Sequence, residues 1–165
     1  MSVEEAASGA PALSITPSLD SGTWATVMTS VSPGSGVMGS RIACYLSDVG
    51  LSVFLLDIIG NDKNRNSIVN SNLNKTIKSR PEPLLDKSNV HNITTGNIID
   101  DINKIKDSDW IIEAVSEKEN IKKEVLDIIE KNKKKESIVS TNTSGLSINN
   151  LVKGRSKEFK ENFLG

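Results

Sequence analysis

The chain has 165 residues, the size of one ordinary domain and enough to bury a single core. Its formal net charge of -1, with 25% charged and 36% hydrophobic residues, argues against a polyanion-binding surface, so we expect no nucleic-acid partner. The longest apolar stretch, 49–59, is interrupted by Ser52 and Asp57 and is too short to span a bilayer.

The first third of the sequence predicts a loose leader, a strand, a glycine turn and a helix. Residues 1–23 carry few large apolar side chains, so burial there cannot offset the entropy of ordering and we expect a loose segment. The β-branched content of 24–31 predicts a strand. An amphipathic helix follows, because apolar residues recur at spacings of three and four, and Gly50 is placed to end it. The predicted apolar stripe consists of Met38, Ile42, Tyr45, Leu46 and Val49.

Strands and helices alternate in the rest of the chain. The apolar run 51–57 fits a buried parallel strand that ends in an acid. The Asn- and Lys-rich segment 61–87 has weak periodicity and indicates an excursion from the sheet, in which Pro81 and Pro83 end any helix before them. Further strands are expected at 93–95, 109–114 and 137–140, and helices at 99–105 and 119–131. This alternation predicts an α/β fold, a three-layer Rossmann-type doubly wound, mostly parallel sheet in a single domain over 24–165.

Three glycines form a G-x-G-x-x-G string between the first strand and the first helix, at Gly34, Gly36 and Gly39. The first permits a tight turn, the second lets the backbone approach a pyrophosphate, and the third lets helix and strand pack closely. The phosphates would rest on the helix N-terminus, where free N–H groups and the dipole favour an anion.

Asp57 stands 18 residues after Gly39, at the end of the second predicted strand. An acid at this place accepts hydrogen bonds from the adenosine ribose hydroxyls and repels a 2′-phosphate. The pattern therefore predicts NAD as the cofactor. The alternative is a glycine turn and a surface aspartate with no ligand.

Other candidate residues follow later strands. Ser144 comes after the strand 137–140, at the edge where ligands bind in open α/β sheets, although turn capping is an alternative role for it. Glu117 and Lys122 flank the start of the helix 119–131, and their positions alone favour an exposed pair. Arg41, in the first predicted helix, either touches a phosphate or points outward.

Several short strings accompany the glycine loop. They are Gly-Ser-Gly-Val-Met-Gly-Ser at 34–40, Leu-Leu-Asp-Ile at 55–58, Ile-Thr-Thr-Gly-Asn at 93–97, Trp-Ile-Ile-Glu-Ala-Val at 110–115, Ser-Thr-Asn-Thr-Ser-Gly at 140–145, Gly-Arg-Ser at 154–156 and Phe-Leu-Gly at 163–165. Together they resemble the 3-hydroxyacyl-CoA dehydrogenase family of fatty-acid β-oxidation over about four fifths of the chain. The variety is most similar to the bacterial forms fused to an enoyl-CoA hydratase module.

The resemblance implies roles for individual residues. Glu117 and Lys122 match positions that contact the nicotinamide half of NAD, and Ser144 matches a catalytic serine whose hydroxyl meets the substrate's 3-oxygen and the cofactor. We predict no metal site. The predicted cofactor contacts are Gly34, Ser35, Gly36, Val37, Met38, Gly39, Asp57, Ile58, Ala114, Val115, Glu117, Lys122, Asn142 and Ser144.

The family's reaction transfers a hydride from (3S)-hydroxyacyl-CoA to NAD⁺ and gives a 3-oxoacyl-CoA, with a histidine as base and a glutamate orienting it. That histidine follows Phe-Leu-Gly by two residues in the family, and this chain stops at Gly165. The sole histidine, His91, does not match it. We therefore expect a domain incomplete at its C-terminus that binds NAD with little or no turnover. The alternative is a non-catalytic NAD-binding remnant or interaction module.

The resemblance also bears on partners. The family's helical second domain closes the substrate site and forms the dimer interface, so an acyl-CoA substrate and a dimer are expected only with that domain. Cys44 is the single cysteine, which excludes an internal disulfide and a cysteine metal cluster and fits a reducing compartment. No basic residue precedes Arg41, so we read no targeting signal and expect a cytoplasmic protein.

Overall fold

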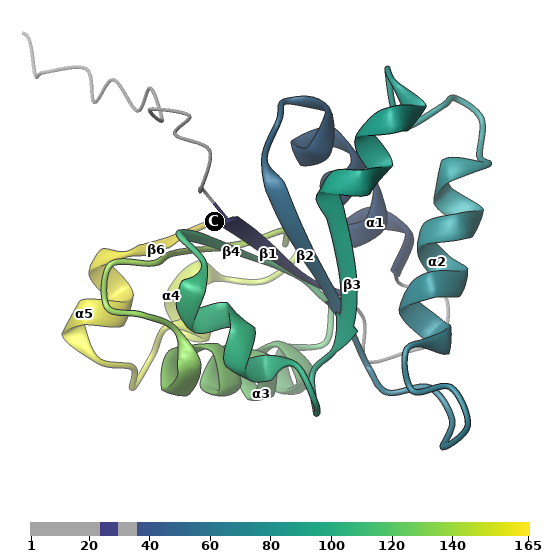
Figure 1. Ribbon diagram of the computed structural model, residues 1–165. Coiled ribbons are helices and arrows are strands. Elements are labelled where there is room, and N and C mark those ends of the chain that lie inside the picture. Colours follow the sequence, from purple (N-terminus) through teal and green to yellow (C-terminus); the bar gives the residue numbers. More distant parts are fainter. Residues whose placement is uncertain (1–23, 30–35) are drawn as a thin grey trace, which may run out of the picture.

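The computed structural model describes residues 24–29 and 36–165 (Figure 1). The predicted leader, the end of the predicted first strand, and Gly34 and Ser35 lie outside the described residues. The strands are β1 (Trp24–Thr29), β2 (Ser52–Asp57), β3 (Ile93–Asn97), β4 (Trp110–Ala114), β5 (Ile138–Thr141) and β6 (Phe163–Leu164). The α-helices are α1 (Gly36–Asp48), α2 (Ser67–Ile77), α3 (Glu119–Asn132), α4 (Ile148–Leu151) and α5 (Lys157–Glu161). The 3-10 helices are η1 (Lys87–Asn92) and η2 (Ile102–Asp107).

The strands form one sheet in the order β3-β2-β1-β4-β5-β6, and every neighbouring pair is parallel. In the middle of the sheet, Val27 pairs with Leu55 on one side and with Ile112 on the other. This is the strand order of a Rossmann fold, as predicted. The order reverses between β1 and β4, so the carboxyl ends of these two strands mark the crevice where such sheets bind their ligands.

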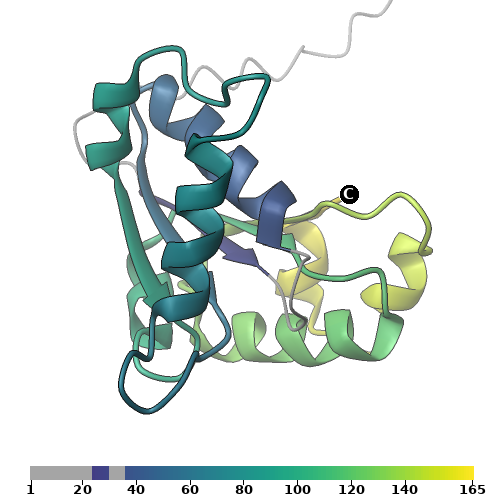
Figure 2. The same cartoon turned by 90° about the vertical axis from the view of Figure 1, so that its right-hand side faces the viewer.

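Helices cover both faces of the sheet. Helices α1 and α2 lie on one face and α3 lies on the other (Figures 1 and 2). Alternate side chains of β2 enter two separate cores, because successive residues of a strand point to opposite faces. The core under α1 and α2 contains Ala43, Cys44, Leu46, Leu51, Val53, Leu55, Val69, Leu73, Leu84 and Ile112. The core under α3 contains Phe54, Leu56, Ile105, Ile111, Val115, Val125, Leu126, Ile129, Val139, Leu151, Phe159 and Phe163.

The predicted inner face of the first helix was right for Leu46, which is buried, and for Ile42, which packs against the core, but wrong for the other three residues. Met38, Tyr45 and Val49 are 51%, 67% and 46% exposed, whereas the buried side of α1 consists mostly of small residues. The buried residues are Gly36, Gly39, Ser40, Ala43, Cys44, Leu46 and Ser47. Short side chains let a helix approach a sheet closely, so apolar character did not identify the contact face. The predicted end of the helix was right, because Gly50 has a φ of +87°, a conformation that suits glycine after a helix.

Two other elements differ from their predicted form. The segment 61–87 contains a full helix, α2, which buries Val69 and Leu73 against the sheet and α1. Weak periodicity concealed it, because most of its residues are polar. The helix expected at 99–105 is the 3-10 helix η2, which starts three residues later and buries Ile105 alone.

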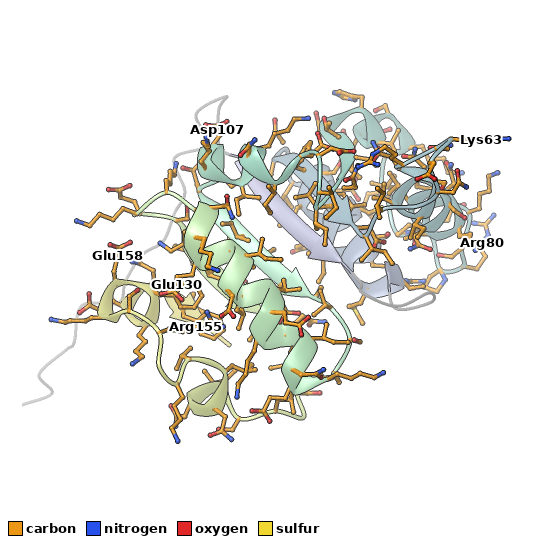
Figure 3. All side chains as sticks on the ribbon, turned by 90° about the horizontal axis from the view of Figure 1, so that it is seen from below. Lys63, Arg80, Asp107, Glu130, Arg155 and Glu158 are labelled. Atoms are coloured by element: carbon orange, nitrogen blue, oxygen red, sulfur yellow. The ribbon has the colours of Figure 1, made fainter. Side chains whose placement is uncertain are left out.

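Arg155 ties the last part of the chain to α3. Its side chain is 6% exposed, and it forms ion pairs with Glu130 (2.9 Å) and Asp127 (2.8 Å) of α3. The same guanidinium donates to the carbonyl oxygens of Leu151 and Lys123, both at 3.0 Å, and lies over the Phe159 ring. Figure 3 shows Arg155 and Glu130 side by side between α3 and the C-terminal helices. One buried cation thus joins α3, α4 and α5.

We expect Arg155→Ala to lower the free energy of unfolding by about 2–4 kcal/mol, since it removes two ion pairs and two charge-assisted hydrogen bonds from a largely buried site. Urea denaturation monitored by circular dichroism measures this change. Lys157→Ala is the control, because the Lys157 side chain is 90% exposed and its pair with Glu161 should contribute little. Equal stability of both variants would contradict the assigned role of Arg155.

Candidate cofactor site

The first part of the site joins the end of β2 to the start of α1. Asp57 is the last residue of β2 and is fully buried. Its Oδ1 accepts a hydrogen bond from the Ile58 N–H (2.7 Å), and its Oδ2 accepts one from Asn72 Nδ2 of α2 (3.1 Å). Its carboxylate is therefore held in one orientation at the carboxyl edge of the sheet.

Gly36 lies directly beside this carboxylate. A Cβ built on Gly36 would lie 3.3 Å from Asp57 Oδ2 and would collide with the amide of Asn72. Only a residue without a side chain brings the start of α1 so close to the acid, as the dinucleotide hypothesis requires of the second glycine. Gly36 and Asp57 therefore fit the adenosine and phosphate half of NAD.

The first turn of α1 has features that favour an anion. It contains no acidic residue, and Val37 and Met38 are about half exposed there. The free N–H groups of such a turn favour negative charge. Arg41 does not point toward this end, since its Nη2 donates to the hydroxyl of Ser79 (3.1 Å) beyond α2. Of its two predicted roles, the structure supports the outward one.

The second part of the site joins the loops that follow β4 and β5. Glu117 is exposed and accepts hydrogen bonds from the Thr143 hydroxyl (2.6 Å) and from the Ser144 N–H (3.2 Å). The Thr143 bond is the main reason why the pKa of Glu117 lies below its ordinary value of 4.5. Glu117 thereby fixes the backbone of Ser144, whose hydroxyl lies on an exposed residue. Glu117 and Ser144, two of the predicted site residues, are therefore neighbours.

Lys122 does not form an exposed pair with Glu117, so that interpretation was wrong. Lys122 is fully buried on the inner face of α3, and its Nζ binds both carboxylate oxygens of Glu113 at 2.9 and 3.1 Å. It also donates to the carbonyl oxygen of Val115 at 3.2 Å. The sequence interpretation missed Glu113, although a charged residue inside a buried strand requires a buried partner.

The remaining predicted contacts line the same edge of the sheet. Ala114 ends β4, and Val115 follows it, both nearly buried. Asn142 follows β5 and donates its N–H to the carbonyl oxygen of Glu113 (2.7 Å), so it continues the pairing of β4 and β5. The structure thus places the described candidates at the carboxyl edge, in one group on the β2 side of β1 and a second on the β4–β5 side, with the exception of Lys122, which is enclosed in the core under α3.

A hollow of about 350 Å³ lies elsewhere on the molecule, lined by Phe54, Thr94, Lys104, Asp107 and Ser108. Ser108 precedes β4 and Thr94 is near the start of β3, so the hollow lies toward the amino ends of the strands. Lys104 Nζ lies 4.5 Å from the centre of the Phe54 ring within it. Ligands of open α/β sheets bind at the opposite edge, so we do not assign this hollow to the cofactor.

Thr143→Val should raise the pKa of Glu117 toward its ordinary 4.5, because the largest cause of its lowering is removed. Since the folded-state pKa is lowered, the bond stabilises the fold above the ordinary pKa, and this stabilisation is lost as the pH falls through the folded-state value. Carboxyl-detected NMR titration measures the shift. Asp100 is an internal control at the β3 edge, where Arg65 lowers its pKa to about 2. An unchanged Glu117 titration would contradict the assigned contact.

Comparison with known proteins gives the family. The model of the 3-hydroxyacyl-CoA dehydrogenase NAD-binding domain matches residues 31–165. A probable 3-hydroxyacyl-CoA dehydrogenase of Bacillus subtilis is 43% identical over 80% of this chain, which covers 19% of that protein. One of Deinococcus radiodurans is 39% identical, over 80% of this chain and 38% of its own length. The chain therefore spans well under half the length of these relatives.

A solved structure agrees with this assignment. The (S)-3-hydroxybutyryl-CoA dehydrogenase of Ralstonia eutropha is 28% identical and superposes with a TM-score of 0.60, over 84% of this chain and 47% of that one. The sheet order, the Gly36–Asp57 contact and the family match are consistent with one another. The chain belongs to the NAD-binding domain family of the 3-hydroxyacyl-CoA dehydrogenases.

Proposed function

We propose that this chain holds NAD along the carboxyl edge of its sheet and supplies the cofactor half of a 3-hydroxyacyl-CoA dehydrogenase of fatty-acid β-oxidation. The observation that carries the proposal is the contact between Gly36 and the oriented, buried carboxylate of Asp57. Asp57 would accept hydrogen bonds from the adenosine ribose hydroxyls, and the first turn of α1 would face the pyrophosphate. The family match supports the choice of cofactor.

The nicotinamide half would then lie across the end of β1, beside Glu117 and Ser144. NAD⁺ supplies a hydride acceptor for the 3-hydroxyl carbon of the substrate. In our proposal the Ser144 hydroxyl donates a hydrogen bond to the 3-oxygen, while Glu117 holds the backbone of Ser144 in place. The site residues and the oxidation of (3S)-hydroxyacyl-CoA to 3-oxoacyl-CoA remain predictions from the resemblance.

Partners and location are also predictions. We propose an acyl-CoA substrate and a dimer for the complete enzyme with its helical domain. Within the described residues, no helix has the length and apolar character needed to cross a membrane. We propose a cytoplasmic location. Burial raises the pKa of the Cys44 thiol to about 11, with a further contribution from the Asp48 charge, so very little of the reactive thiolate forms at neutral pH.

Asp57→Asn should weaken NADH binding by about tenfold or more, because a charge-assisted hydrogen bond to a ribose hydroxyl becomes a weaker one. It should also narrow the preference for NADH over NADPH, since the repulsion of a 2′-phosphate disappears. Fluorescence titration with both nucleotides measures these changes. Asp109→Asn is the matched control at the amino edge, before β4, where Asp109 pairs with Lys134. Unchanged NADH affinity in Asp57→Asn would contradict the proposed ribose contact.

The 165-residue chain alone should reduce acetoacetyl-CoA with NADH little or not at all, because the 3-oxygen must gain a proton, general acid–base catalysis supplies about 10²–10⁴-fold, and no described residue is placed for it. His91 precedes β3 at the amino edge of the sheet, opposite Ser144, and its ring binds the carbonyl oxygen of Ser88. A spectrophotometric assay measures turnover. Rates like those of complete enzymes would refute this expectation, whereas binding without turnover agrees with a cofactor-binding unit.

A further inference from the structure

Glu113 is a fully buried acid near the carboxyl end of the central strand β4, and the proposed function gives it no role. Its carboxylate accepts four hydrogen bonds. They come from the N–H of Val115 (2.6 Å), from Lys122 Nζ twice (2.9 and 3.1 Å) and from the Thr141 hydroxyl (2.5 Å). Lys122 in turn completes its bonding with the Val115 carbonyl. These four residues form a closed network between β4, β5 and α3.

Packing alone does not account for this network. Both ions are 0% exposed, and taking two charges out of water costs more than burying apolar side chains of the same volume. The surroundings are apolar, since Ile111, Val115 and Val139 lie near Glu113, on or directly after the same two strands, and belong to the core under α3. Such a pair contributes directed contacts, which an apolar core would lack.

The position of the network suggests what these contacts determine. Val115 follows β4 and Thr141 ends β5, so Glu113 joins the carboxyl ends of two adjacent strands. Immediately beyond, Glu117 joins the loops that leave these same ends, through Thr143 and Ser144. The short segment 114–117 is therefore held at its start by the buried Glu113 and at its end by the exposed Glu117. Displacing its base would move Glu117, and Ser144 with it.

We infer that Glu113 is a positioning residue for the nicotinamide half of the cofactor. It acts through its bonds to Val115, Lys122 and Thr141. These bonds fix the positions of the two loops that carry Glu117 and Ser144. The adenosine half is independent of it, because Asp57 and Gly36 lie on the other side of β1. The inference rests on the proposed function, and it predicts that disruption of the network affects one half of the ligand only.

The test compares NADH with ADP, which carries the adenosine ribose and both phosphates but neither the nicotinamide nor its ribose. Isothermal titration calorimetry gives both affinities for the whole chain. In Glu113→Gln the carboxylate charge is lost, and NADH should bind on the order of tenfold more weakly while ADP affinity changes by less than about twofold. Thr141→Val keeps the buried ion pair and hence the fold, and it should show a smaller loss for NADH in the same direction.

Arg155→Ala is the control variant: it should lower the stability of the fold without moving Glu117 or Ser144. It breaks a different buried ion cluster, at the junction of α3, α4 and α5, and should leave the ratio of NADH to ADP affinity unchanged. If folded Thr141→Val keeps the wild-type ratio, or if both affinities fall together in both network variants, the inference is overturned. A wild-type chain that binds neither ADP nor NADH would instead overturn the proposed function, and this inference with it.

Discussion

Parallel pairing of β1 with both β2 and β4 is the constraint on which the rest of the structure depends. Because the three strands run the same way, each connection must cross a face of the sheet, and α1 and α3 take opposite faces (Figure 2). The ends of β2 and β4 then flank the end of β1. Asp57 and Ala114 mark those ends, so two regions that form separately come to lie on either side of the end of β1.

The fold and the closeness of Gly36 to Asp57 were predictable because their signals are local. Apolar runs of strand length alternate with helical patterns, and a glycine string followed by an acid at the end of a strand has one common use in such sheets. The contact of Gly36 with Asp57 explains why the string needs a glycine beside the acid. Asn72, which orients the acid, was not predictable, since it comes from a polar helix that the hydrophobic pattern barely indicates.

The placement of Lys122 was not predicted because it depends on tertiary contacts. Glu117 and Lys122 are five residues apart and opposite in charge, which suggests a local pair. The helix turns Lys122 inward with Val125, Leu126 and Ile129, so its partner is Glu113 across the core. Two signals were present in the sequence: an acid inside the apolar run 110–115, and a lysine in phase with the apolar face of the next helix.

The inner face of α1 has a mechanical consequence. Gly36, Ala43 and Ser47 are buried and small, so this helix packs closely against the strands. We expect a bulkier residue at the fully buried Ala43 to push α1 away from the strands and its first turn away from Asp57. Core packing in the middle of α1 is thereby linked to the contact between Gly36 and Asp57.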